Sequence, residues 1–121
     1  MENLDYEMPP VKQRKLCYKQ RSITLSPREE KVIIALLHRD SATCNLLICI
    51  GEDLDEEWYK HIRNLLFKFS FVDFDRCLEL EERELFALQI TVDEVDQDYS
   101  HMVTGALSIK LNYLLTGENN D

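Results

Sequence analysis

The sequence predicts an α+β fold, in which two amphipathic helices pack on a small, mainly antiparallel sheet. Helical patterns begin after Ser26 and Asp55, and two later stretches alternate apolar and polar residues as strands do. With 121 residues, 45% of them hydrophobic, the chain has room for one core. We therefore expect one globular domain over residues 22–116, between a flexible basic N-terminal tail (1–21) and a disordered C-terminal tail (117–121).

The expected N-terminal tail is marked by proline and by basic residues. Pro9 and Pro10 block regular structure, because proline lacks the backbone N–H that helices and sheets use. Residues 11–21 then carry no acidic side chain and five basic ones, namely Lys12, Arg14, Lys15, Lys19 and Arg21.

The first helix is predicted from its start signals. Ser26 is a typical N-cap, Pro27 fits the first helical position, and Glu29 completes a capping-box pattern. We expect this helix to end near Arg39. Its buried stripe consists of apolar residues at helical spacing, namely Ile33, Leu36 and Leu37.

A strand and a second helix are expected next. The short apolar run 44–50 is closed by Gly51, and its length and this stop signal favour a buried strand. Asp53 or Asp55 is then the N-cap candidate for a helix over about residues 55–69. Apolar residues of this helix repeat at helical spacing, namely Trp58, Ile62, Leu65, Leu66 and Phe69.

The C-terminal third is expected to complete the sheet. Residues 76–88 fit either a helix or a hairpin, and the pattern leaves both open. Residues 85–92 and 107–113 alternate apolar and polar side chains, so each is predicted as a half-buried strand. We expect these two strands to pair antiparallel across the polar stretch 93–101.

Cysteine usage and hydropathy predict the compartment. The four cysteines, Cys17, Cys44, Cys49 and Cys77, are unevenly spaced, and a chain of this size does not need disulfides, so we expect four reduced thiols. The start of the chain lacks a secretory signal pattern, and the longest unbroken apolar run, residues 32–37, is too short to span a bilayer. We therefore expect a soluble, cytoplasmic protein with no membrane partner.

No residue pattern indicates catalysis, a metal or a cofactor. His38, His61 and His101 stand at element ends or on a polar face, with no serine or cysteine at a motif spacing. Cys44 and Cys49 have four residues between them, as in some zinc sites, but five positions apart on the expected strand they point to opposite faces. We therefore expect no catalytic residues, no metal and no cofactor, and a protein that is not an enzyme.

The charges are segregated along the chain. Residues 1–39 hold eight Lys and Arg against five acids, a balance of +3, whereas residues 40–121 hold six against eighteen, a balance of −12. Such a distribution describes a surface and its partners rather than a reaction.

From this charge we expect a small protein-binding module, meaning a regulator, inhibitor, chaperone or adaptor. Its anionic surface would meet a basic surface of another protein, with Tyr59 or another exposed aromatic residue as the anchor. The sequence leaves the oligomeric state open. The expected acidic residues are Glu52, Asp53, Asp55, Glu56, Glu57, Asp93, Glu94, Asp96 and Asp98.

The alternative is a DNA-binding transcriptional regulator. The run 25–37 resembles the first helix of winged-helix or LuxR-type DNA-binding domains of bacterial response regulators. This resemblance covers about a dozen residues, and the chain departs from the pattern where acidic residues at 55–57 open the would-be recognition helix. Nucleic acid is therefore the less favoured partner. Its expected contacts are Lys12, Arg14, Lys15, Lys19, Arg21 and Arg28.

Overall fold

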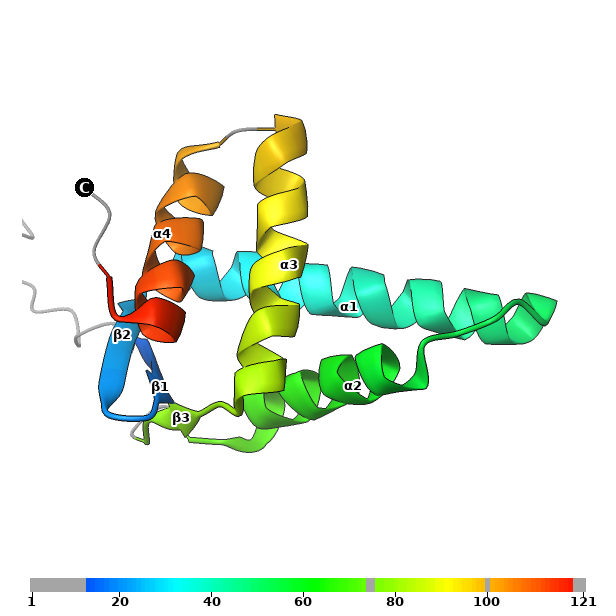
Figure 1. Cartoon of the computed structure of the whole chain (residues 1–121), viewed down its shortest axis with the longest axis horizontal. Helices are drawn as coiled ribbons and strands as arrows, with labels where there is room; N and C mark the ends of the chain where they lie inside the picture. The colour runs from blue at the N-terminus through cyan, green and yellow to red at the C-terminus, as the bar shows by residue number, and fades with distance from the viewer. Residues whose placement is uncertain (1–12, 74–75, 100, 119–121) are drawn as a thin grey trace, which may run out of the picture.

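The computed structural model describes residues 13–73, 76–99 and 101–118, and it confirms the α+β class. Four helices accompany a small three-stranded mixed sheet (Figure 1). The elements in chain order are β1 (Arg14–Tyr18), β2 (Arg21–Leu25), α1 (Pro27–Ile50), α2 (Glu56–Phe71), β3 (Leu78–Glu79), α3 (Glu82–Tyr99) and α4 (Met102–Thr116).

The sheet has the strand order β2-β1-β3, with β1 in the middle. β1 and β2 form an antiparallel hairpin in which Leu16 lies opposite Ile23. β3 pairs parallel to β1, with Leu16 opposite Leu78. Lys19 in the turn between β1 and β2 has φ 57°, a left-handed conformation that a tight two-residue turn requires.

The prediction of a flexible tail over residues 1–21 is wrong where β1 lies. Residues 1–12 lie outside the described part of the chain. Arg14, expected in solvent, is buried, because its guanidinium group donates hydrogen bonds to Glu30 Oε2 (3.2 Å) and to the carbonyl oxygens of Phe69 (3.1 Å) and Val72 (2.7 Å). The arginine thus binds carbonyl groups at the C-terminal end of α2, where the helix dipole favours a cation.

α1 begins as predicted and ends eleven residues later than predicted. The Ser26 hydroxyl accepts a hydrogen bond from the Glu29 N–H (3.1 Å), and the Glu29 carboxylate accepts one from the Ser26 N–H (2.7 Å). The strand predicted over 44–50 is wrong, because no glycine or proline interrupts residues 28–50 and the helix continues to Ile50. Gly51 ends it in a left-handed conformation, with φ 76°.

α2 confirms the second predicted helix. Asp55 is its N-cap, and its carboxylate accepts a hydrogen bond from the Trp58 N–H at 3.2 Å. The helix extends two residues beyond the predicted end, to Phe71.

The two predicted C-terminal strands are wrong, because residues 85–92 lie in α3 and residues 107–113 lie in α4. The alternation misled because both faces of α3 carry apolar residues. Leu88 and Val92 are fully buried, whereas Phe86 and Ile90 are about half exposed. The ambiguous segment 76–88 contains both β3 and the start of α3.

Two of the four cysteines are bonded, so the expectation of four reduced thiols is wrong. Cys17 and Cys77 form a disulfide with their Cα atoms 6.0 Å apart, across the β1–β3 pairing. Cys44 and Cys49 are free. Since structural disulfides persist in oxidising compartments, this bond weighs against the expected cytoplasmic location.

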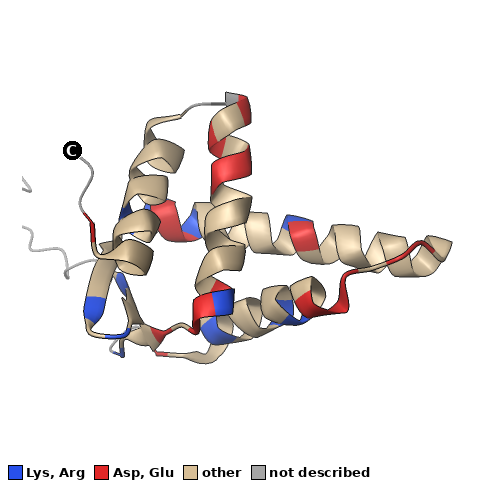
Figure 2. Cartoon of the chain, in the orientation of Figure 1, with Lys and Arg blue, Asp and Glu red and all other residues tan. Residues whose placement is uncertain are grey.

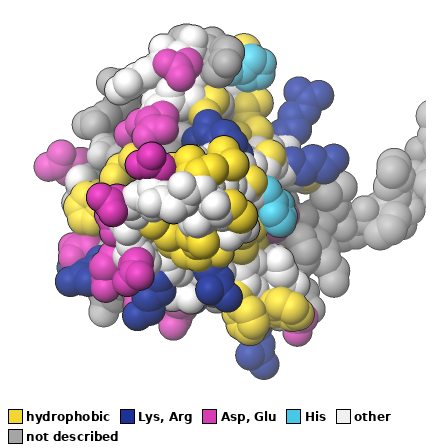
Figure 3. Space-filling model, turned by 90° about the vertical axis from the view of Figure 1, so that its right-hand side faces the viewer, with side chains coloured by type: hydrophobic (Ala, Val, Ile, Leu, Met, Phe, Trp, Pro, Cys, Tyr) yellow, Lys and Arg dark blue, Asp and Glu magenta, His cyan; other side chains and the backbone are white. Residues whose placement is uncertain are grey.

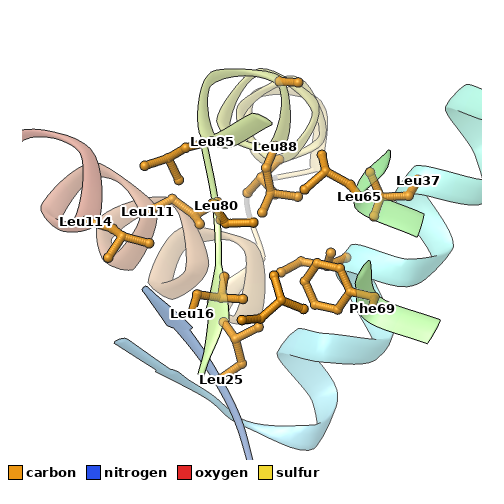
Figure 4. Close-up of a cluster of buried hydrophobic side chains, with 14 of the residues drawn as sticks. Leu16, Leu25, Leu37, Leu65, Phe69, Leu80, Leu85, Leu88, Leu111 and Leu114 are labelled. Carbon is orange, nitrogen blue, oxygen red and sulfur yellow. The ribbon is translucent and has the colours of Figure 1, made fainter. Parts of the chain in front are cut away.

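The core lies where the sheet, α2, α3, α4 and the first half of α1 meet, and leucine dominates it (Figure 4). The second half of α1 leaves this body and runs outward, accompanied by α2 alone (Figure 1). We call residues 41–71 the projecting hairpin. Labelled core residues in Figure 4 include Leu16, Leu25, Leu37, Leu65, Leu88 and Leu111.

Candidate functional site

The projecting hairpin is the part of the described structure in which large apolar side chains are most exposed together. Residues 41–50 of α1 carry no charge, and Cys44 is their one fully buried member. Figure 3 views this end of the molecule and shows hydrophobic side chains spread across it, with acidic side chains along one side. The exposed fractions are 58% for Leu46, 52% for Ile48, 60% for Ile50, 63% for Phe67 and 72% for Phe71.

The hairpin is held together by one buried seam. Ile62 and Leu65 of α2 are fully buried, with Trp58 packed against the same core cluster. Beside the seam the Tyr59 hydroxyl donates a hydrogen bond to Asn45 Oδ1 at 2.6 Å, which ties α2 to the outer half of α1. The relative position of the two helices is therefore fixed by packing and by one polar link.

A groove of about 1010 Å³ runs along one side of the hairpin. Its apolar lining comes from Ile48, Leu54, Tyr59 and Phe67. Acidic residues line the end of the groove at the tip of the hairpin, and basic residues line it further along α2. The acidic residues are Glu52, Asp53 and Glu56, and the basic ones are Lys60 and Arg63.

The acidic residues predicted for the tip have three different roles. Within the described part of the chain, Glu52, Asp53 and Glu56 make no ion pair, and they face the groove. Asp55 caps α2. Glu57 lies on the other side of α2, 3.6 Å from His61 Nε2 and 3.7 Å from Arg83 Nη1.

The remaining predicted acidic residues lie on α3 and are separate from the tip (Figure 2). Asp93 accepts a hydrogen bond from Ser108 (2.5 Å), and Asp96 accepts one from Thr104 (2.8 Å), so both help to join α3 to α4. Glu94 lies 3.9 Å from Arg39, and Asp98 is exposed. The structure thus divides the single acidic face expected from the sequence into two groups.

Tyr59 is half-buried and forms a wall of the groove rather than a protruding anchor. The Arg63 guanidinium carbon lies 5.4 Å from the centre of the Tyr59 ring, which covers the aromatic face. Phe67 is the exposed aromatic residue of the groove, and the sequence reading missed it. The signal in the sequence was its position outside the buried stripe of α2. In the structure its ring centre lies 4.7 Å from that of Phe71, with the ring planes tilted by 38°.

The basic residues expected to contact DNA are divided too. Arg14 is buried, and Arg21 donates hydrogen bonds to the carbonyl oxygens of Leu114 and Leu115 at the end of α4, both at 3.0 Å. Lys12 lies outside the described residues. Lys15, Lys19 and Arg28 are exposed.

The described residues show little that could support metal or acid–base chemistry. Among residues 13–73, 76–99 and 101–118, no group of three or more His, Cys, Asp or Glu could hold a metal ion. His101 Nδ1 accepts a hydrogen bond from the Val103 N–H and caps α4, and His38 is exposed. Burial raises the pKa of the Cys44 thiol, and the charges of Asp40 and Asp55 raise it further, so this thiol is a poor nucleophile at neutral pH.

α1 is also the one described helix that is long and apolar enough to cross a membrane. It has 24 residues, and an 18-residue stretch of it has a mean hydropathy of 1.4. Core helices and signal sequences meet the same criteria, so the helix is weak evidence of a membrane location. Only 22% of that 18-residue stretch is buried, so most of its residues lie outside the core.

Comparison with models of known protein families, with curated proteins and with solved structures finds no match to this chain.

Proposed function

We propose that this chain is a non-enzymatic protein-binding module, a small regulator, inhibitor, chaperone or adaptor, that binds another protein through the projecting hairpin. The observation that carries the proposal is the exposed apolar surface at the end of the hairpin, with unpaired acidic side chains beside it (Figure 3).

The apolar surface supports binding because burying it is favourable. Each large apolar side chain that is fully removed from water contributes about 1.5–3 kcal/mol. Contiguous exposed apolar residues bordered by polar ones are typical of protein interaction sites. Leu46, Ile48, Ile50 and Phe67 are each more than half exposed in the single chain.

The acidic side chains support a partner with a basic surface. Glu52, Asp53 and Glu56 lie together at the tip, and they are solvent-exposed. Complementary charge of this kind raises the association rate and fixes orientation more than it raises affinity. The acidic group on α3 is partly bound to α4, so the tip is the stronger candidate for this contact.

No observation favours the DNA-binding alternative. Arg14 and Arg21, two of its six expected contacts, are bound to groups within the fold. α1 and α2 lie side by side as an antiparallel hairpin (Figure 1), whereas a helix-turn-helix sets its two helices at roughly 90–120°.

The test is a comparison of variants with equal net charge. The immobilised chain would capture partners from a lysate of its source cells, in parallel with the tip variant Glu52→Lys/Glu56→Lys and with Glu81→Lys/Glu118→Lys as control. We expect the first variant to lose partners that the control retains. The association rate of a purified partner should fall at least about tenfold in the tip variant and should fall with added salt. A salt-independent rate that is the same in all three proteins would refute the proposal.

A further inference from the structure

We propose that the groove of the projecting hairpin binds a second copy of this chain, so that two hairpins pack about a two-fold axis into a four-helix bundle. This inference rests on the proposed function, because it uses the same hairpin, and it names the partner that the groove fits.

The first observation is the order of charges along the groove. Acidic side chains stand at the tip, and Lys60 and Arg63 stand one to two helical turns further along α2. Seven residues separate Glu56 from Arg63, which is about 10 Å along a helix. Among the described residues none of the groove's charges has an ion pair, so both signs are available to a partner.

A two-fold axis turns this order into complementarity. In such an interface residue i meets residue j, and residue j meets residue i. An axis that crosses α2 near Tyr59 and Lys60 places Glu56 of each copy opposite Arg63 of the other copy. If all charges in the groove had the same sign, the grooves of two copies would repel each other.

The apolar lining follows the same symmetry. The axis carries Phe67 of one copy toward the tip of the other, where Ile48 and Leu54 line the groove. Phe67 and Ile48 are each more than half exposed in the single chain. Their burial supplies the free energy of association, whereas the ion pairs set the register.

The net charge of the chain does not prevent this contact. The projecting hairpin holds five acidic residues against three basic ones, a balance of −2 out of the total of −9. The hairpin extends away from the body, which carries the remaining charges of the chain (Figure 2). At physiological ionic strength they are screened beyond about 8 Å.

The test uses charge reversal in the full chain and analytical ultracentrifugation. The first variant, Lys60→Glu/Arg63→Glu, makes the groove acidic, and the second, Glu52→Lys/Asp53→Lys/Glu56→Lys, makes it basic. We expect the unaltered chain to dimerise with a Kd between about 1 μM and 1 mM, and each variant alone to dimerise at least about tenfold more weakly. An equal mixture of the two variants should form heterodimers, because each acidic groove then meets a basic one.

Recovery in the mixture separates loss of binding from loss of folding. The control Glu81→Lys/Glu118→Lys should dimerise like the unaltered chain. A monomer at all concentrations, variants that dimerise unchanged, or a mixture that stays monomeric would each overturn the inference. A monomer that still captures a different protein through Glu52 and Glu56 overturns self-association alone, whereas a dimer that captures nothing overturns the binding of other proteins alone.

Discussion

The two halves of α1 differ in composition and in burial. The half that carries charged residues packs into the core, whereas the half without charged residues is mostly exposed. Residues 27–40 contain six charged residues and still bury Ile33, Leu36 and Leu37 in the core. Residues 41–50 contain no charged residue, yet their apolar side chains are mostly exposed. Burial within this chain therefore explains the apolar residues of the first half but not those of the second half, which the proposed binding to another molecule would cover.

The largest change in stability is expected from removing the Cys17–Cys77 disulfide, which lies in the body of the molecule and not in the projecting hairpin. The Cys17–Cys77 disulfide joins residues 60 apart, and loop-closure entropy gives such a bond about 4 kcal/mol of stability. Urea unfolding of Cys17→Ala/Cys77→Ala should show that the free energy of unfolding falls by about this amount. Amide exchange of residues 41–50 should change little, since these residues open locally rather than by global unfolding. The control Cys49→Ala should change neither the free energy of unfolding nor the amide exchange. Equal losses of stability in the two variants would contradict the assigned disulfide.

The second largest change in stability is expected from a comparison of two leucines on α1 that differ in exposure. Leu37 is fully buried and Leu46 is 58% exposed. Leu37→Ala should lower the free energy of unfolding by about 3 kcal/mol, because it leaves a cavity in the core. Leu46→Ala should change it by less than about 0.5 kcal/mol. Both values come from urea unfolding, and a large loss at Leu46 would mean that the outer half of α1 is packed after all.

The N-caps of α1 and α2 allow the same comparison between the body and the tip of the hairpin, with smaller expected changes in the free energy of unfolding. Ser26 starts α1 in the body, and Asp55 starts α2 at the tip. Ser26→Ala should lower global stability by about 1 kcal/mol. Asp55→Ala should mainly fray the tip, which speeds amide exchange of Trp58 about fivefold with a smaller global loss. If Asp55→Ala proved as costly globally as Ser26→Ala, the tip would unfold only together with the body.

The smallest expected change is in reactivity rather than in stability. Cys44 is buried and Cys49 is exposed, on the same half of α1. Because burial, with Asp40 and Asp55, raises the pKa of Cys44, less of this thiol is thiolate at neutral pH. Iodoacetamide should therefore modify Cys44 at least about tenfold more slowly, and its labelling should rise only at higher pH. In Cys49→Ala the fast phase should vanish, and equal rates in the unaltered chain would show that Cys44 is not packed.

Local signals in the sequence were enough to predict where the helices start. The capping box at Ser26 and the N-cap at Asp55 each involve residues three positions apart, so neighbouring residues carry the information. Long-range pairing could not be predicted in this way. β1 meets β3 across some 60 residues, and its basic side chains made it resemble a solvated tail.

The candidate site could be predicted only in part, because local signals again identified some residues but not the arrangement of the helices. Acidic residues at the tip could be selected from composition alone, and Glu52, Asp53 and Glu56 do line the groove. The groove itself exists because α1 continues through residues 44–50, which were predicted as a strand. On a strand Ile48 would be buried, whereas on the helix it is exposed beside α2.

The position of the disulfide has a practical consequence for the projecting hairpin. The bond joins residue 17 to residue 77, so the whole hairpin lies inside a covalently closed ring of chain. A protease that cleaves the exposed tip once therefore opens the ring without releasing a fragment. Such a nicked molecule would migrate as one species until reductant separates its two pieces.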